Sequence, residues 1–87
     1  MIGAVDLFYF GELRERLGID TERVEPPSRV QTVADLIGWL AERGGAYAAA
    51  LAEPARIGAA VDDQPAGPED SIFGAGDVAL FPPMGAL

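Results

Sequence analysis

Residues 4–10 read Ala4-Val5-Asp6-Leu7-Phe8-Tyr9-Phe10, an apolar stretch interrupted only by Asp6. This density of aromatic and β-forming residues is typical of a strand covered on both faces, since a strand with one wet face alternates apolar and polar residues. We therefore expect a central strand of a sheet here. Gly11 breaks the pattern, so the strand should end before it.

Two short elements follow this strand. Leu13 and Leu17 are four positions apart with charged residues between them, which predicts a short helix over residues 12–17 that ends at Gly18. Residues 21–25 have the composition of a strand with one polar face. Because this strand is near the first one in sequence, we expect an antiparallel pair with the second strand at the sheet edge.

The clearest helical pattern begins at Thr32. Thr32 suits the N-cap position, and Asp35 resembles the partner residue of a capping box, although Glu or Gln is more usual there. The apolar residues that follow recur at helical spacing: Val33, Leu36, Ile37, Leu40 and Ala41. We expect this helix to cover the sheet and to end at Gly44-Gly45. An alanine-rich turn or two over residues 46–53 should extend the helical layer up to Pro54.

The last third of the chain predicts two further strands. Residues 57–61 have the composition of a strand. Residues 62–65 are typical of a turn, and residues 66–76 of an irregular connection. A last strand over residues 78–81 must end at Pro82-Pro83, because proline donates no ladder hydrogen bond. The order of elements predicts an α+β fold, a mixed sheet with helices on one face, whose simplest form is a β-grasp (ubiquitin-like) roll.

The composition indicates one small acidic domain. The chain has 87 residues, with 14 acidic side chains against 6 basic ones, so its net charge is −8. The hydrophobic share of 49% is that of a globular chain and not of a disordered one. At about 100–200 residues per domain, we expect a single domain over residues 1–87, with residues 84–87 as a flexible C-terminal tail.

The residue types that are missing exclude several classes of function. The sequence has no Cys, His or Lys, and so lacks thiolate nucleophiles, Schiff-base lysines and the usual zinc ligands. We expect no catalytic side chain, no metal and no bound cofactor. The acidic balance argues against nucleic acid as a partner, and no apolar run approaches the roughly 18 residues of a membrane span. A cytoplasmic protein with protein partners is therefore expected.

Several side chains are candidates for contact with a partner. Phe8 and Phe73 could lie on an exposed sheet face, although aromatic residues more often belong to the core. Trp39 lies off the main helical stripe and is the better candidate for exposure. Five acidic residues and no basic one give residues 57–87 a net charge of −5, which suits either steering toward a basic partner or a plain solvated surface. These acidic residues are Asp62, Asp63, Glu69, Asp70 and Asp77.

The C-terminus is the most unusual feature. Pro82-Pro83 is followed by Met84-Gly85-Ala86-Leu87, four residues without a charged side chain. Four extended residues span about 14 Å, enough to thread a narrow channel in another protein and present the α-carboxylate there. An ordinary frayed chain end is the alternative.

Two segments resemble those of a known family. Residues 7–18, Leu7-Phe8-Tyr9-Phe10-Gly11-Glu12-Leu13-Arg14-Glu15-Arg16-Leu17-Gly18, resemble the aromatic first strand, LRE-type turn and glycine of MoaD-type ubiquitin-like sulfur carriers, the small subunits of molybdopterin synthase. Residues 76–83, Gly76-Asp77-Val78-Ala79-Leu80-Phe81-Pro82-Pro83, resemble the sequence just before the tail of that family. Residues 32–36 lie where the family starts its main helix, so the resemblance covers essentially the whole chain.

This resemblance implies a β-grasp fold and a carrier cycle. An E1-like adenylating enzyme uses ATP to activate the terminal carboxylate, and sulfur then replaces the adenylate to give a thiocarboxylate. The tail enters the large subunit of molybdopterin synthase, which converts cyclic pyranopterin monophosphate into the dithiolene of molybdopterin. The carrier itself would bind no cofactor, and ATP would be used by the partner enzyme.

The resemblance also implies where the site lies. The functional group would be the C-terminal carboxylate, at Leu87 or, after trimming, at Gly85 or Ala86. Partner contacts are expected at Phe8, Phe73, Phe81, Pro82, Pro83, Met84, Gly85 and Ala86. The family ends in Gly-Gly, whereas this chain ends Gly85-Ala86-Leu87. Three explanations of this difference stay open: the tail is trimmed, the partners have adapted to it, or the protein is a homologue that binds partners without carrying sulfur. A carrier that serves thiamine or cysteine synthesis is a further alternative.

Overall fold

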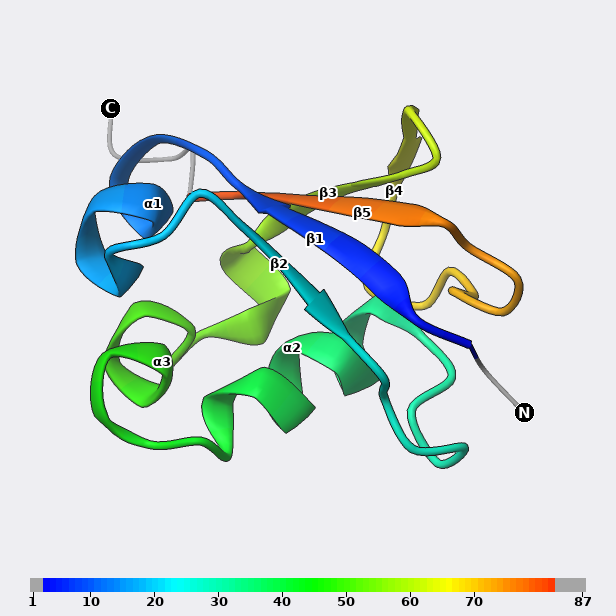
Figure 1. Ribbon diagram of the computed structural model, residues 1–87, viewed down its shortest axis with the longest axis horizontal. Helices are drawn as coiled ribbons and strands as arrows, with labels where there is room; N and C mark the ends of the chain where they lie inside the picture. Colours follow the sequence, from blue (N-terminus) through cyan, green and yellow to red (C-terminus); the bar gives the residue numbers. More distant parts are fainter. Residues whose placement is uncertain (1–2, 83–87) are drawn as a thin grey trace.

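The computed structural model, which describes residues 3–82, has a five-stranded sheet covered on one face by helices (Figure 1). The strands are β1 (Val5–Tyr9), β2 (Thr21–Val24), β3 (Gly58–Val61), β4 (Gln64–Ala66) and β5 (Asp77–Phe81). Their order across the sheet is β2-β1-β5-β3-β4, in which β1 and β5 run parallel and the other neighbours antiparallel. The predicted α+β fold with a mixed sheet is therefore confirmed.

The first strand, β1, has the predicted place inside the sheet but is covered on only one face. The first strand is interior, between β2 and β5, and β2 takes the predicted edge position. However, β1 is not covered on both faces. Val5, Leu7 and Tyr9 are buried beneath the helices, whereas Asp6 and Phe8 are partly exposed on the other face. The prediction was wrong because an aromatic residue on an open sheet face looks in sequence like a core residue.

A tight hairpin joins β3 to β4. Its two loop residues, Asp62 and Asp63, have positive φ angles of 49° and 68°, which match the twist that two-residue hairpins require. Residues 64–66 then pair with β3, with Val61 opposite Gln64. The predicted turn over residues 62–65 was therefore too long. A proline in this short strand is tolerated because β4 is an edge strand.

The helical layer consists of α1 (Gly11–Leu17), α2 (Val33–Ala41), α3 (Gly45–Ala50) and a 3-10 turn, η1 (Pro54–Arg56). The predicted capping box of α2 is complete. The backbone N–H of Asp35 donates to Oγ1 of Thr32 at 3.1 Å, and the backbone N–H of Thr32 donates to the Asp35 carboxylate at 3.2 Å. The backbone N–H groups of Gln31 and Thr32 hold the pKa of Asp35 below its usual value. A short polar residue thus fixes where α2 begins.

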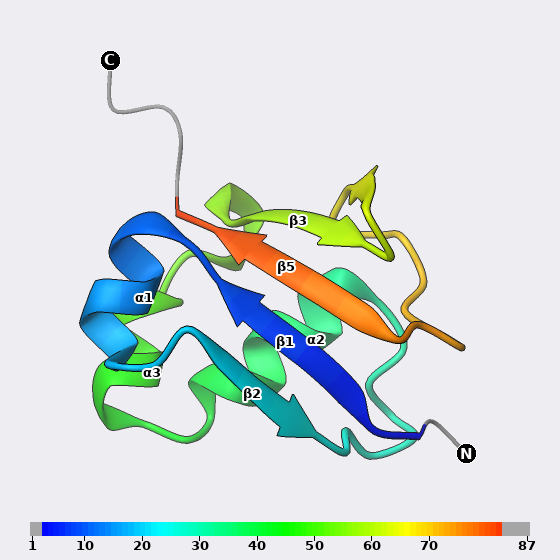
Figure 2. The ribbon, with the colours of Figure 1, turned by 45° about the horizontal axis from the view of Figure 1, so that its top comes forward.

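The core lies between these helices and one face of the sheet (Figure 2). The apolar stripe predicted for α2 is buried at four positions, and Leu13 of α1 and Leu51 after α3 join it. The stripe residues are Val33, Leu36, Ile37 and Leu40. Each such side chain contributes about 1.5–3 kcal/mol by leaving water. None of the helices within residues 3–82 has the length and hydrophobicity of a membrane-spanning segment.

A polar cluster ties the sheet edge to the helices. The Glu22 carboxylate accepts hydrogen bonds from the hydroxyl of Tyr9 at 2.7 Å, the hydroxyl of Tyr47 at 2.9 Å and Nη1 of Arg43 at 2.8 Å. The Arg43 guanidinium also lies over the ring of Trp39, 5.5 Å from its centroid. Trp39, which the sequence made a better candidate for exposure than Phe8 or Phe73, is partly buried because it packs against the core beside Arg43.

We expect Glu22→Gln to lower the free energy of unfolding by about 1–3 kcal/mol at neutral pH, because it weakens hydrogen bonds to a charged acceptor. Burial alone would raise the pKa of Glu22, but the hydrogen bonds from Arg43 and the two tyrosines outweigh it, and the pKa lies below its ordinary value of 4.5. A carboxylate with a lowered pKa stabilises the fold above that ordinary value, and this stabilisation is lost as the pH falls through the folded-state pKa.

Urea unfolding at neutral pH and near pH 3 measures this effect. The difference between wild type and Glu22→Gln should shrink in acid. Glu12→Gln is the matched control, because the pair between Glu12 and Arg16 is exposed and should contribute no more than about 0.5 kcal/mol. An equal difference at both pH values would contradict the assignment of the stabilisation to the ionised carboxylate.

Candidate functional site

The sheet face opposite the helices changes from charged to apolar along the strands. In the strand register, Arg23, Asp6 and Asp77 lie side by side in one row. The next row is apolar apart from its first member and consists of Thr21, Phe8, Ala79, Ala60 and Pro65. Phe81 and Gly58 form the row beyond it. This open face is therefore acidic where β5 begins and apolar where β5 ends.

Aromatic side chains gather at the apolar end of the open face. The rings of Phe10 and Phe81 stack with their centroids 5.1 Å apart, and Phe10 keeps 44% of its surface exposed. Phe8 lies on the same face, one row away from Phe81. The structure thus brings together two predicted contact residues, Phe8 and Phe81. Sequence reasoning missed Phe10, although the period-2 spacing of Phe8 and Phe10 could have found it.

Phe73 lies elsewhere. It is 75% exposed in the loop between β4 and β5, next to the buried Ile72. This loop precedes the first residue of β5, whereas Phe81 is the last, about 13 Å further along the strand. Phe73 is therefore exposed, as a contact residue must be, but it does not belong to the same cluster as Phe8 and Phe81.

The two motifs of the sequence meet where β5 ends. The backbone N–H of Phe10 donates to the carbonyl of Leu80 at 3.1 Å, which continues the parallel pairing of β1 with β5. Gly11 follows with a φ of +56°, and a Cβ at this position would lie 3.2 Å from Cγ of Pro82. Both the backbone conformation and the close approach of the proline ring favour glycine here. The N-terminal motif therefore fixes the position of Pro82.

The remaining predicted site residues follow Pro82. The contacts expected at Pro83, Met84, Gly85 and Ala86, and the terminal carboxylate expected at Leu87 or, after trimming, at Gly85 or Ala86, lie outside the described residues. Their roles stay predictions. What the structure provides is the place on the sheet from which the chain continues toward them (Figure 2).

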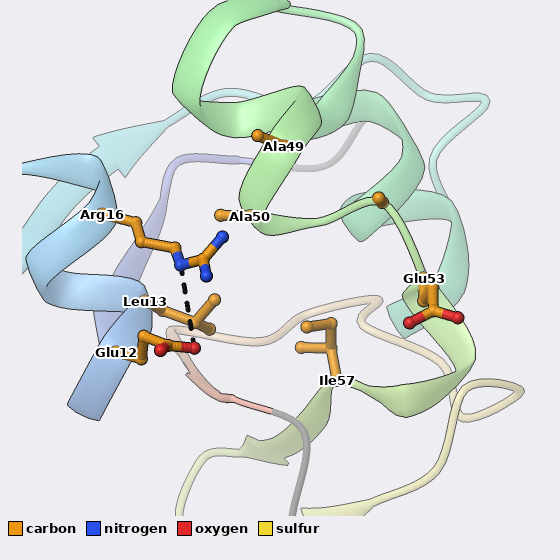
Figure 3. A pocket seen from close by; sticks show the side chains of 8 residues that line it. Glu12, Leu13, Arg16, Ala49, Ala50, Glu53 and Ile57 are labelled. Atoms are coloured by element: carbon orange, nitrogen blue, oxygen red, sulfur yellow. Dashed lines mark ion pairs between the residues drawn. The ribbon is translucent and has the colours of Figure 1, made fainter. Parts of the chain in front are cut away.

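The open face is hollowed between Phe8, Phe10, Ala60, Asp63, Asp77 and Ala79, with a volume of about 180 Å³. A second hollow of about 160 Å³ lies between α1, α3 and the residues on either side of η1 (Figure 3). Leu13, Ala50 and Ile57 line it, together with charged groups at its rim. These charges are compensated within the chain, because Glu12 pairs with Arg16 at 3.7 Å and Glu53 pairs with Arg56 at 3.2 Å.

Four of the five acidic residues after residue 57 divide into two groups, and the fifth, Glu69, is exposed and belongs to neither. Oδ1 of Asp62 accepts hydrogen bonds from the backbone N–H groups of Gly76 and Asp77, at 3.0 and 2.9 Å, and Oδ2 of Asp70 accepts one from Gly67 at 2.7 Å. These two carboxylates hold backbone turns. Asp63 and Asp77 instead line the hollow on the open face. Within residues 3–82, no group of carboxylates could hold a metal ion.

Comparison with known proteins agrees with this arrangement. The ThiS family model matches residues 7–85. A Pyrococcus furiosus protein provisionally described as molybdopterin converting factor subunit 1 has a similar structure, with a TM-score of 0.72 and 25% identity over 94% of this chain and 99% of its own. SAMP1 of Haloferax volcanii shares the fold, with a TM-score of 0.70 and 23% identity over 98% of this chain and 100% of its own. No match was found among curated proteins.

We expect Gly11→Ala to destabilise the fold more than Gly18→Ala does. Both glycines have positive φ, so either substitution costs about 1–2 kcal/mol in backbone strain. Only Gly11 has a neighbour, Pro82, that an added Cβ would displace. Urea unfolding gives the two losses, and the NMR signals of Phe81 report whether the end of β5 moves. Equal losses with unshifted Phe81 signals would show that the contact with Pro82 does not constrain the chain.

Proposed function

The chain belongs to the ThiS family of ubiquitin-like sulfur carriers, and we propose that it serves as the small subunit of a molybdopterin synthase, carrying sulfur on its C-terminal carboxylate. One observation carries the proposal. The family model extends past the described fold to residue 85, and the structure holds Pro82, at the base of this tail, against the glycine of the N-terminal motif. The likeness to the Pyrococcus furiosus protein supports the molybdopterin pathway.

The chemistry explains why such a protein needs no catalytic side chain. A free carboxylate is a poor acyl donor, so in the adenylating enzyme it first attacks the α-phosphorus of ATP, pyrophosphate leaves, and a mixed anhydride with AMP is formed. Hydrosulfide then attacks the acyl carbon, the bond to the bridging oxygen breaks, AMP leaves with that oxygen, and the S–H proton is lost to the partner enzyme. The product is a thiocarboxylate on the tail. The side chains of the partner enzymes would carry out every proton transfer in these reaction steps. This agrees with a chain that has no Cys, His or Lys.

The proposed partners are the large synthase subunit and the E1-like adenylating enzyme. Both would bind the apolar end of the open face, around Phe8, Phe10 and Phe81, because this cluster adjoins the base of the tail at Pro82. Exposed aromatic side chains of this kind are enriched at protein interfaces. The proposal places the carrier in the cytoplasm, where the adenylating enzyme has ATP.

The first prediction concerns the terminus. The protein is incubated with the adenylating enzyme, ATP and a sulfur source, and its intact mass is measured. A species heavier by the exchange of one oxygen for sulfur is expected, either on the full chain or on one trimmed to Gly85 or Ala86. A variant with Ala86→Gly and Leu87 deleted, which ends in Gly-Gly, should be charged at least as well, because glycine permits the closest backbone approach.

The control for this experiment lacks Gly85, Ala86 and Leu87 and should not be charged. The open sheet face also favours a second function, a ubiquitin-like module that binds partners without carrying sulfur. If the wild-type mass stays unmodified while the Gly-Gly variant is charged, the enzymes are active and the natural chain is such a module. If no variant is charged although the enzymes charge their own known carrier, the family chemistry does not apply to this chain.

The second prediction concerns the contact surface. Phe10→Ala and Phe81→Ala should each weaken binding to the large subunit about tenfold or more, as expected for aromatic residues at the centre of an interface. Ile19→Ala is the control, because Ile19 is an exposed apolar residue outside the aromatic cluster. Phe73→Ala tests the contact predicted from sequence alone. Calorimetric titration measures the affinity of each of these four variants for the large subunit. Unchanged affinities for Phe10→Ala and Phe81→Ala would show that the interface lies elsewhere on the protein.

A further inference from the structure

We propose that the hollow on the open face receives an arginine side chain from a protein partner. The aliphatic part of the arginine would lie against Phe8 and Ala79, and its guanidinium beside the carboxylates of Asp63 and Asp77. This inference concerns how the open face selects a partner. It does not depend on whether the C-terminus carries sulfur.

The register of the sheet creates the hollow. Ala79 of β5 lies between Phe8 of β1 and Ala60 of β3, so two small residues are next to a large one in the same row. Phe10 closes the side toward the base of the tail. The resulting space of about 180 Å³ has aromatic and methyl walls that suit the methylene stem of a long side chain.

The charge at the hollow has no counterpart in the described chain. Asp63 lies in the β3–β4 loop and Asp77 begins β5, so two separate elements each contribute an acidic residue to the lining of the hollow, at the end where β5 begins. Neither carboxylate forms an ion pair with any residue from 3 to 82. Five of the six arginines pair with other carboxylates: Arg16, Arg23, Arg29, Arg43 and Arg56. The sixth, Arg14, lines a different hollow together with Gly18 and Asp20 and is not among the residues that line this one.

These charges decide between possible occupants. An acidic side chain would be repelled, and a purely apolar one would remove water from two carboxylates without replacing their hydrogen bonds. A cation with an apolar stem satisfies both parts of the hollow. Arginine fits better than lysine, because its planar guanidinium holds five donors in a rigid fork that can reach two carboxylates at once, and because it is more weakly hydrated than an ammonium group.

The hollow between α1 and α3 gives the contrast. Its rim carries both signs of charge, and these charges are already paired. Glu12 pairs with Arg16 (Figure 3), and Glu53 pairs with Arg56. It therefore has no preference for a cation. The open-face hollow combines an apolar wall with an uncompensated acidic end, so it selects the sign of the occupant as well as its shape.

An NMR titration of the full chain tests this proposal with n-butylguanidinium as the probe. Saturable shifts are expected for the methyl groups of Ala60 and Ala79 and for the Phe8 ring. Butanol has the stem without the charge, guanidinium has the charge without the stem, and n-butylammonium replaces the planar head by a compact one. Each should bind more weakly than n-butylguanidinium if stem and planar cation are recognised together.

The matched variants locate the charge. Asp63→Asn with Asp77→Asn should weaken binding about fivefold, the effect of losing two exposed ion pairs. Asparagine tolerates the positive φ at residue 63, so the hairpin is retained, and a dispersed amide spectrum confirms it. Glu15→Gln with Glu69→Gln removes the same net charge from exposed positions outside the hollow and should leave binding unchanged.

Several outcomes would overturn the proposal. Equal weakening by both double variants would mean that net charge alone attracts the probe. Equal binding of butanol would mean that the carboxylates play no part, and equal binding of n-butylammonium would remove the preference for arginine. Shifts confined to Leu13 and Ala50 would place the probe in the hollow between α1 and α3.

Discussion

The parallel pairing of β1 with β5 is the constraint on which the rest of the structure depends. Parallel neighbours cannot be joined by a short turn, so all residues between Tyr9 and Asp77 act as the connection between them. Closing this long connection costs conformational entropy. The burial of the apolar stripe of α2 against both strands offsets this cost. Residues near the two ends of the chain thereby become neighbours at the centre of the sheet.

This pairing also determines the geometry of the site. Because β1 and β5 run in the same direction, the residues after both strands meet at one end of the sheet, which brings Phe10 onto Phe81 and Gly11 onto Pro82. The helices of so short a chain cover only one face, so the aromatic residues of the other face stay available. An exposed apolar cluster beside the base of the tail is thus a consequence of the topology.

The sequence predicted some of these features well because they depend on local physics. The capping box at Thr32 and Asp35 and the stripe through Leu36 involve residues within one helix, so spacing alone reveals them. The antiparallel pairing of β2 with β1 was predicted from their closeness in sequence, and both this pairing and the expected edge position of β2 were correct. Features that depend on residues distant in sequence were harder to predict. Phe8 is an example, because it lies on the open face only as a result of which side of the sheet the helices cover.

The site was predicted less completely than the fold for the same reason. Phe10 becomes a site residue only because Phe81, some seventy residues away in sequence, stacks on it. The positive φ angles of Asp62 and Asp63 were not foreseen, because this hairpin lacks the usual Asn-Gly or Asp-Gly pair. That turn makes β4 possible, and it also places Asp63 at the hollow of the open face.

The distribution of charge follows from where the arginines lie in sequence. All six precede residue 57, and five of them pair with carboxylates that also lie before that residue. The acidic residues after it are left to hold turns, as Asp62 and Asp70 do, or to face solvent, as Asp63 and Asp77 do. Because β3 and β5 are adjacent, two of these acidic residues, Asp63 and Asp77, line the hollow at one end of the open face. A partner that covers the face must therefore supply positive charge near the start of β5 and apolar surface near its end, which fixes the partner's orientation relative to the tail.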